Sequence, residues 1–558
     1  MLTFIHTYTA LSFPALVKSG LYREGDGIKL MHKPGFTPPN DFNSALKDGS
    51  PLFSLLKEKR PAFYVDRLQG GVGNTNKYNY DKKLLSQLRN TPGGSFFGFQ
   101  MHEWASNLKS DMSRISAAAE ENGVDVKNKS AFSAFMKSIA ERRTDVFLEA
   151  YTPEEWEHRP ISDSLSEFLS AADSLYKLRC AETEGLVFPA DSYFMSPKTE
   201  IKYGARLLLP ECGWQIPNMR VQAAYTRGMA KSAGIPWGIY WECWQNDEST
   251  GFTIPFSLRE GQDEWLEDML HKANGHELPF EKREYGGSSL SLMKRAWRYA
   301  YFSGARFFAE EYGVCNTFRS LDPAELGPYG EEKREFLRFA EKYPDTGAPY
   351  VPFALVLPEK LPMLDINFPE EWFGFRPDEN APYTGETTKR INEAVEIIFG
   401  KKGKHGNQGH VLKSAGMPDV FDIIHENSET LSSYEYLIDL TNGPSFRAKH
   451  KNVVSIKEAD ELLNELLPVR INGGLHTAYS KTPGGWLVLC MNNDGVLHSA
   501  FSPDVLLSEA DVKTKIETNK KTPYIEKLDG EGELKAEGNG LYVSLGAGQW
   551  MLLMIREN

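Results

Sequence analysis

Residues 204–244 of this chain read GARLLLPECGWQIPNMRVQAAYTRGMAKSAGIPWGIYWECW. Two short apolar runs, each typical of a buried parallel strand, flank a segment whose apolar residues have helical spacing. Strand, helix and strand in this order form the repeating unit of parallel sheets. The first run ends at Glu211, and the second ends at Glu242 between Trp241 and Trp244. Because active sites of (β/α) barrels lie at the carboxyl ends of the strands, this stretch predicts such a barrel and such a site.

The composition limits the classes of protein that fit. The chain has 558 residues, enough for two to four domains, and 41% of them are hydrophobic and 25% charged, as in ordinary globular proteins. The net charge is −13 and no basic stripe is present, so we expect no nucleic-acid partner. No apolar run approaches the roughly 20 residues of a membrane span, so we expect no membrane partner.

The five cysteines form no CxxC pair and are odd in number, which indicates reduced thiols. The amino-terminal segment MLTFIHTYTA lacks a basic n-region and a long apolar core. It reads better as a first strand than as a signal peptide. These two observations predict a cytoplasmic protein.

Short apolar runs alternate with helical stretches along the first part of the chain. The predicted strands are Leu2–Tyr8, Gly27–His32, Ala62–Arg67, Phe96–Glu103, Leu186–Tyr193, Ala205–Glu211, Trp237–Trp244 and Ala305–Tyr312. Eight strands are what a closed barrel requires. The crossovers over 107–184 and 245–289 are longer than one helix needs and follow strand ends, so we expect them to form lids or walls above the site. Within the second, Gly286–Ser289 is predicted as a hinge.

The fold class predicted is α/β with three domains. Residues 1–345 form an N-terminal (β/α)8 TIM barrel, the catalytic domain. Residues 346–467 form a small flavodoxin-like (glutamine amidotransferase-like) α/β domain, which carries no GxGxxG after its first strand and is therefore no nucleotide site. Residues 468–558 lose helical periodicity and form a C-terminal all-β sandwich domain.

Four predicted barrel strands end in glutamates, at Glu103, Glu211, Glu242 and the pair Glu310 and Glu311. Retaining glycoside hydrolysis needs two carboxyl groups about 5–5.5 Å apart, one as acid/base and one as nucleophile. Acids from opposite sides of a barrel can meet across its mouth, and Glu103 and Glu242 satisfy this condition as catalytic residues. Tryptophans beside these acids offer flat faces for sugar stacking. The predicted substrate-binding residues are Asp66, His102, Trp104, Tyr193, Glu211, Trp214, Trp241, Trp244 and Glu311.

This order of parts resembles the family 42 β-galactosidases and their relatives in clan A of the retaining glycoside hydrolases. The segment Gly286–Gly313 is similar to the stretch that links the nucleophile strand to the eighth strand in those enzymes. The resemblance implies that Glu103 is the acid/base and Glu242 the nucleophile. It also implies that His102, in place of the asparagine of the clan, holds the sugar 2-hydroxyl, and that the protein is a homo-oligomer, commonly a trimer.

Alternatives remain open. Glu211 or Glu311 could replace one member of the catalytic pair, or the barrel could bind carbohydrate without cleaving it. A metal-dependent hydrolase would need histidines two apart on one strand, whereas the first strand, FIHTY, offers His6 alone. His102 and Glu103 likewise lack the second histidine of HExxH. The prediction is therefore an enzyme that acts on glycosides or oligosaccharides with no metal or cofactor.

Overall fold

The structure is a computed structural model of the chain. It describes residues 2–30, 42–66, 81–90, 96–102, 195–214, 216, 218–247, 251–254, 280–283, 285–311, 313–359, 361, 385–441, 443–518 and 523–556, with further positions between 117 and 190.

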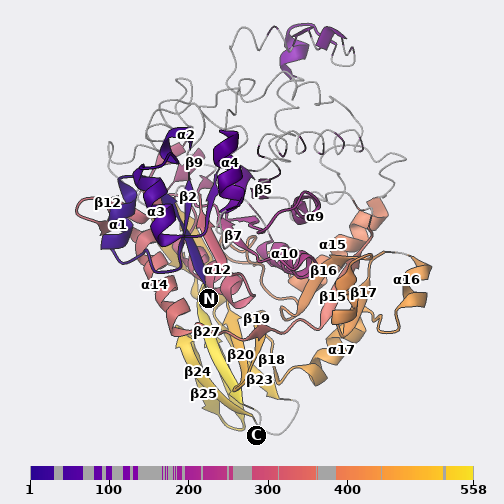
Figure 1. Ribbon diagram of the computed structural model, residues 1–558. Helices are drawn as coiled ribbons and strands as arrows, with labels where there is room; N and C mark the ends of the chain where they lie inside the picture. Colours follow the sequence, from indigo (N-terminus) through magenta and orange to yellow (C-terminus); the bar gives the residue numbers. More distant parts are fainter. Residues whose placement is uncertain are drawn as a thin grey trace.

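An eight-stranded, wholly parallel sheet forms the first part of the chain, in the order β5-β4-β3-β2-β1-β11-β7-β6. Its strands β2, β5 and β7 lie above the yellow strands of the last part of the chain in Figure 1. Its strands are β1 (Thr3–Tyr8), β2 (Gly27–Leu30), β3 (Phe63–Val65), β4 (Phe96–His102), β5 (Val187–Ala190), β6 (Glu211–Cys212), β7 (Gly238–Trp241) and β11 (Phe307–Glu310). The order runs from β1 to β5 on one side and from β11 back to β6 on the other, which is the strand order of a (β/α)8 ring. The parallel TIM-like domain that the sequence predicts is therefore present, with a strand in each of the eight predicted runs.

Helices follow the strands. They are α1 (Ser12–Lys18), α2 (Phe42–Ala45), α3 (Pro51–Lys59), α4 (Lys82–Arg89), α9 (Ser196–Lys202), α10 (Met219–Ala233), α12 (Leu290–Phe302), α13 (Gly313–Thr317) and α14 (Pro328–Lys342). The crossover after β7 carries a small three-stranded sheet of β8 (Gln245–Asp247), β9 (Gly251–Ile254) and β10 (Phe280–Lys282). Helices therefore alternate with the strands of the barrel, as the spacing of apolar residues in the sequence predicts.

A second α/β unit follows the barrel. Three parallel strands in the order β16-β15-β17 form its sheet. Its elements are β15 (Phe353–Leu357), α15 (Gly385–Phe399), β16 (Phe421–His425), β17 (Tyr436–Asp439), α16 (Pro444–Lys449) and α17 (Ile456–Leu466). The flavodoxin-like assignment and the domain boundaries stay predictions.

The last part of the chain is all-β. One sheet has the order β14-β19-β20-β27-β24 and a second has β18-β23-β26-β25, with a separate hairpin of β21 and β22. The strands are β14 (Ala348–Pro349), β18 (Val469–Ile471), β19 (His476–Thr482), β20 (Gly485–Met491), β21 (Val496–Ser499), β22 (Ser502–Leu506), β23 (Val512–Thr518), β24 (Tyr524–Gly530), β25 (Glu533–Glu537), β26 (Gly540–Leu545) and β27 (Trp550–Arg556). The segment over 343–349, which follows α14, therefore ends in a strand of this sheet, since β14 pairs with β19.

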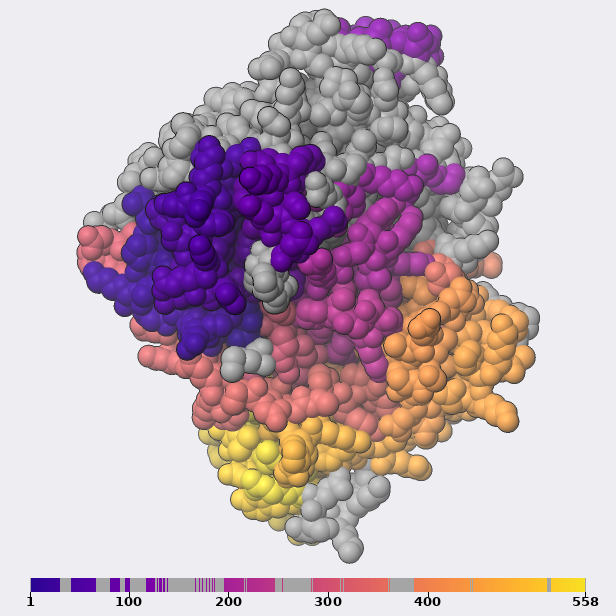
Figure 2. Space-filling model, in the orientation of Figure 1, coloured from indigo at the N-terminus to yellow at the C-terminus, as the bar shows by residue number. Residues whose placement is uncertain are grey.

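Helix α10 joins the barrel to the second α/β unit, and the space-filling view shows the two parts in contact (Figure 2). Eleven of its fifteen residues are buried, so it is enclosed on nearly all sides rather than amphipathic. A Cβ at Gly228 would lie 2.6 Å from the carbonyl oxygen of Ile423 in β16, so the helix and the sheet meet at backbone distance. Arg227 Nε donates to Asp422 Oδ1 at 2.7 Å across the same contact.

Helix α12 joins the barrel to the β domain. Arg295 is fully buried and donates to the carbonyl oxygen of Gly548 at 2.9 Å and to Asn493 Oδ1 at 3.0 Å. The helix between β7 and β11 is thus fixed from outside the barrel. No helix among the described residues is long and apolar enough to cross a membrane.

Candidate active site

Glu242 lies directly beyond the carboxyl end of β7. The ladder of the sheet continues through it, because its N–H donates to the carbonyl oxygen of Cys212 at 2.7 Å. On the other side of β7, the N–H of Glu311 donates to the carbonyl oxygen of Trp241 at 2.9 Å. Glu242 is fully buried and Glu311 is 3% exposed. Two glutamates therefore end neighbouring strands at the same edge of the sheet.

Successive side chains of β7 face opposite sides of the barrel wall. The hydroxyl of Tyr240 reaches Asp66 Oδ2 at 3.2 Å, which follows β3 on another part of the ring, so Tyr240 faces the interior. The ring of Trp241 packs edge-to-face on Trp297 of α12, with 6.4 Å between centroids, so Trp241 faces the helices. Alternation then directs Glu242 to the same face as Tyr240.

The prediction that Trp241 stacks on sugar is therefore wrong. Its ring is fully buried in the layer between sheet and helix. It contributes to the core that holds β7 against α12, where a planar, apolar ring packs well.

Gly213 provides the space beside Glu242. A Cβ at this position would lie 2.5 Å from the carbonyl oxygen of Glu242 and 2.7 Å from its Cβ. These distances are closer than side chains approach, so a larger residue would displace the glutamate. The glycine of the predicted βαβ stretch thus fixes where the second of its two acids lies.

Glu211 pairs with Tyr240 in the register of β6 and β7. It therefore lies two residues nearer than Glu242 to the amino end of the strands. Its backbone is held by α10, whose Gln222 donates from Nε2 to the Glu211 carbonyl oxygen at 2.9 Å. Glu211 is 1% exposed. The structure places it in the same wall as Glu242 but below it.

The cysteines beside the two acids are not activated. Burial raises the pKa of the Cys212 thiol well above its usual range, and the charges of Glu211 and Glu242 raise it further. Burial likewise raises the pKa of Cys243, with Glu311 adding to the effect. Both remain neutral thiols near pH 7, in agreement with a packing role.

Glu311 is oriented by Trp244. The indole Nε1, which can only donate, lies 2.8 Å from Glu311 Oε2. Trp244 is half-buried. The structure therefore brings together two of the predicted binding residues, although the contact it shows is between the two side chains themselves.

A network of contacts between polar groups crosses the barrel interior, nearer than these acids to the amino ends of the strands. Lys29 of β2 lies 2.8 Å from Asp66 Oδ2 and donates to the carbonyl oxygen of Glu310 at 2.7 Å. It also lies 3.4 Å from the hydroxyl of Tyr240. Asp66, a predicted hydroxyl-binding residue, is fully buried in this network. The network links four strands, β2, β3, β7 and β11.

Sequence reasoning missed Lys29 and Tyr240. The signal was present for Lys29, since a lone lysine in the apolar run GIKLM must find a partner when buried. Tyr240 had no such signal, because a tyrosine in a strand is usually core.

Trp214 lies after β6 and is half-buried. Its ring meets that of His410 edge-to-face at 4.3 Å, and His410 Nε2 donates to the Trp214 carbonyl oxygen at 2.7 Å. Burial lowers the pKa of His410. Trp214 is therefore packed against the loop that precedes β16, apart from the Glu311 and Trp244 pair.

Four predicted site residues fall wholly or partly outside the described residues. Glu103, Trp104 and Tyr193 lie outside them, and of His102 only the backbone is described, where it pairs with Ala190 at the end of β4. Their roles stay predictions. In the part of the chain that the structure describes, no three histidine, cysteine, aspartate or glutamate side chains are grouped as a metal site would require.

The chain was compared with protein families, with curated proteins and with solved structures. No family model matches the chain. A probable mannosyltransferase of Saccharomyces cerevisiae is 21% identical over 173 residues, which are 27% of this chain and 30% of that protein. The chain thus spans under a third of the length of this curated relative.

The solved structures similar to this chain include an α-L-fucosidase of Paenibacillus thiaminolyticus, with 10% identity over 100% of this chain and 99% of that one and a TM-score of 0.43. A family 42 β-galactosidase of G. stearothermophilus is 8% identical over 100% of this chain and 98% of that one, with a TM-score of 0.45. These neighbours are glycoside hydrolases, the class that the order of parts resembles. TM-scores this low do not establish a shared fold, so the barrel rests on the strand pairings described above.

Proposed function

We propose that this chain is a retaining glycoside hydrolase that cleaves β-linked sugars by double displacement. The observation that carries the proposal is the position of Glu242, a buried carboxyl group at the carboxyl end of a barrel strand, on the interior face. A buried carboxyl group without catalytic use is costly, and barrel enzymes place their reacting groups at this edge.

Glu242 would attack the anomeric carbon and form a covalent glycosyl-enzyme. Glu103, which follows the last residue of β4, would protonate the departing oxygen and then deprotonate the water that releases the sugar. In the sheet order, the strands β3, β2, β1 and β11 lie between β4 and β7, so the two acids come from well-separated parts of the ring. This arrangement supports a pair that meets across the mouth.

A second candidate pair is Glu242 with Glu311. They end neighbouring strands at one level, and such strands lie about 4.8 Å apart. This spacing is close to the separation of about 5–5.5 Å found in retaining enzymes. However, Glu311 Oε2 accepts a hydrogen bond from Trp244 Nε1 at 2.8 Å, which ties this carboxyl group to a second predicted binding residue. We therefore propose that Glu311 binds a sugar hydroxyl.

Substrates whose leaving groups differ in acidity can distinguish the two candidate catalytic pairs. Aryl β-glycosides with acidic phenols need no protonation, whereas those with weakly acidic phenols do. We expect Glu103→Gln to keep turnover of the first kind and to lose at least about a hundredfold on the second. Glu311→Gln serves as the matched variant and should slow both kinds alike.

If Glu311→Gln instead shows the selective loss and Glu103→Gln shows none, the acid/base assignment moves to Glu311. Wild-type protein that binds glycosides without cleaving any of them would favour a carbohydrate-binding barrel. Activity that disappears with a chelator and returns with a divalent cation would favour a metal-dependent hydrolase.

The remaining parts of the chain suggest an assembly role. We propose that residues 346–467 form a flavodoxin-like domain that mediates a homo-oligomer, as the resemblance to family 42 implies. Light scattering coupled to size exclusion measures the mass directly. A monomer at all concentrations would contradict this part of the proposal.

A further inference from the structure

The backbone that follows Glu242 is held by a buried turn that is remote in sequence. The N–H of Ser288 donates to the carbonyl oxygen of Cys243 at 2.8 Å. The Oγ of Ser288 lies 3.4 Å from the carbonyl oxygen of Glu242. Ser288 and Ser289 are fully buried. Gly286–Ser289, predicted as a hinge, is therefore an anchored turn that contacts both peptides after the proposed nucleophile.

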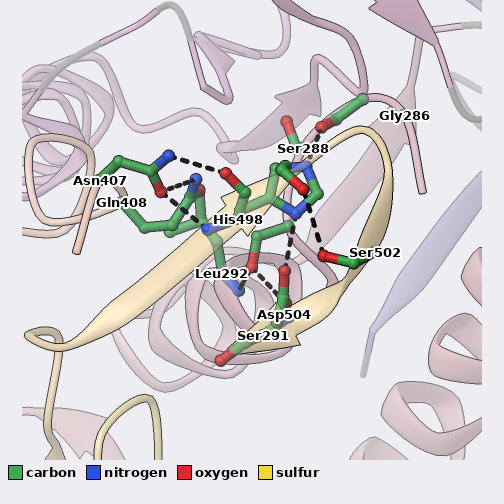
Figure 3. A network of polar contacts seen from close by, with 12 residues as sticks. Gly286, Ser288, Ser291, Leu292, Asn407, Gln408, His498, Ser502 and Asp504 are labelled. Carbon is green, nitrogen blue, oxygen red and sulfur yellow. Dashed lines mark hydrogen bonds and ion pairs between the residues drawn. The ribbon is translucent and has the colours of Figure 1, made fainter. Parts of the chain in front are cut away.

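The hairpin of β21 and β22 in the β domain contacts this turn through polar side chains (Figure 3). His498 Nε2 lies 2.8 Å from the carbonyl oxygen of Gly287, and its Nδ1 lies 2.7 Å from Asp504 Oδ1. The other oxygen of Asp504 accepts from Ser289 Oγ at 2.7 Å and from the N–H of Ser291 at 3.0 Å. One histidine and one aspartate thus hold the turn and the start of α12 together.

Both ring nitrogens of His498 face acceptors, a carbonyl oxygen and a carboxylate. A carbonyl oxygen and an ionised carboxylate accept hydrogen bonds and do not donate them. His498 is 6% exposed, so water does not readily replace either contact.

The second α/β part of the chain fixes His498 in turn. Asn407 Nδ2 donates to the His498 carbonyl oxygen at 2.7 Å, and the His498 N–H donates to Asn407 Oδ1 at 2.9 Å (Figure 3). The N–H of Asn407 also donates to the Val496 carbonyl oxygen at 2.9 Å. The segment before β16 therefore holds the backbone of His498, and the barrel turn contacts its ring, so the three parts meet at this one residue.

We propose that His498 is a positioning residue for the reaction, acting through the Gly287 carbonyl and the Ser288 amide on the Glu242–Cys243 backbone. The inference rests on the proposed role of Glu242. It assigns the β domain a part in the chemistry, because this domain supplies the group that fixes the segment next to the nucleophile. Displacements of about 1 Å at a reacting group can cost a hundredfold in rate.

Two substitutions separate the contacts of His498. The amide nitrogen of glutamine reaches the position of Nε2, so His498→Gln keeps a donor to Gly287 and loses the one to Asp504. Asparagine places its amide nitrogen near Nδ1, so His498→Asn keeps the donor to Asp504 and loses the one to Gly287. Each variant loses one hydrogen bond, so their melting temperatures should fall by similar amounts.

The two variants should differ in rate. We expect His498→Asn to lower kcat about tenfold with KM nearly unchanged, and His498→Gln to keep kcat within about twofold. Amide hydrogen exchange, read by mass spectrometry, should rise about tenfold over 286–292 and over 242–247 in His498→Asn, and only around 496–506 in His498→Gln.

Equal kcat values in the two variants, or faster exchange confined to 496–506 in both, would overturn the inference. The exchange measurement needs no substrate. If wild-type protein cleaves no glycoside, the proposed function fails, while exchange that spreads to 242–247 in His498→Asn alone still supports the control of this backbone by His498.

Discussion

Glu310 and Glu311 are neighbours in sequence, yet they lie on opposite faces of the barrel wall. Glu310 faces the helices and forms an ion pair with Lys333 of α14. Glu311 faces the interior, where its partner is the N–H of Trp244. The same division separates Trp241, which packs on Trp297, from Glu242, its immediate neighbour.

The difference distinguishes an acid that is paired for stability from the acids that we propose to act on a substrate. On the helix-facing side, Glu310 is matched by a lysine, and burial nevertheless raises its pKa. On the interior side, Glu311 accepts from the Trp244 N–H, and the backbone of Glu242 lies so close to Gly213 that a Cβ would not fit between them. A lysine neutralises a carboxylate and stabilises the fold, whereas a neutral donor orients a carboxylate without adding an opposite charge.

The largest effect should come from exchanging acid for amide on each face. Glu242→Gln removes the proposed nucleophile and should lower kcat at least about a thousandfold, with little change in stability. Glu310→Gln leaves the buried Lys333 without its counter-charge and should cost about 3 kcal/mol in the free energy of unfolding. Its turnover per folded molecule should stay near wild type. Steady-state kinetics and urea unfolding measure the two quantities.

The comparison fails if the two variants behave alike. Near-normal turnover in Glu242→Gln would place the nucleophile elsewhere. A thousandfold loss of turnover in folded Glu310→Gln would mean that the helix-facing side takes part in the chemistry.

Substitutions of the two tryptophans should also differ, one affecting stability and the other affecting activity. Trp241→Ala removes a fully buried ring and should cost about 3–5 kcal/mol in the free energy of unfolding. Trp244→Phe keeps an aromatic ring but removes the donor to Glu311, so we expect kcat/KM to fall about tenfold with stability nearly unchanged. Unchanged kcat/KM in Trp244→Phe would show that this hydrogen bond serves structure alone.

A smaller and pH-dependent effect should come from the buried junction of α10, α12 and the β domain. Burial lowers the pKa of His476 from 6.5 to about 4, although Asp419 lies 3.2 Å away. The folded state therefore binds fewer protons than the unfolded state between these values. Stability is fully present above about pH 6.5 and is lost as the pH falls toward 4, by up to about 3 kcal/mol from this histidine.

Urea unfolding of wild type and His476→Gln at pH 7 and pH 4.5 measures this contribution. The glutamine variant should lose less stability on acidification than wild type, because its side chain does not titrate. Equal losses in the two proteins would show that other groups control the response to acid.

Most of the barrel could be predicted because its strands are short apolar runs with helical segments between them. The end of β11 at Glu310 lies two residues from the predicted end, and β1 ends at Tyr8 as predicted. β6 is shorter than predicted, since Ala205–Pro210 contributes an isolated bridge at Leu208 rather than a paired strand.

The site was predicted less completely, for physical reasons. Counting strand ends predicted Glu242 and Glu311 at the carboxyl ends of neighbouring strands, where the structure has them, whereas Trp241, predicted beside the sugar, packs on Trp297 behind the sheet. Lys29 and His498 act through partners more than 200 residues away in sequence, which no local pattern reveals.

Trapping the covalent intermediate tests the central claim most directly. A 2-deoxy-2-fluoro glycoside with an activated leaving group slows the second step of a retaining enzyme more than the first, so the sugar stays on the nucleophile. Wild-type protein should gain the mass of one fluoro sugar, and peptide mapping should place it on Glu242, with no label on Glu242→Gln. Label on Glu211 or Glu311, or hydrolysis that never produces a labelled protein, would contradict the assignment.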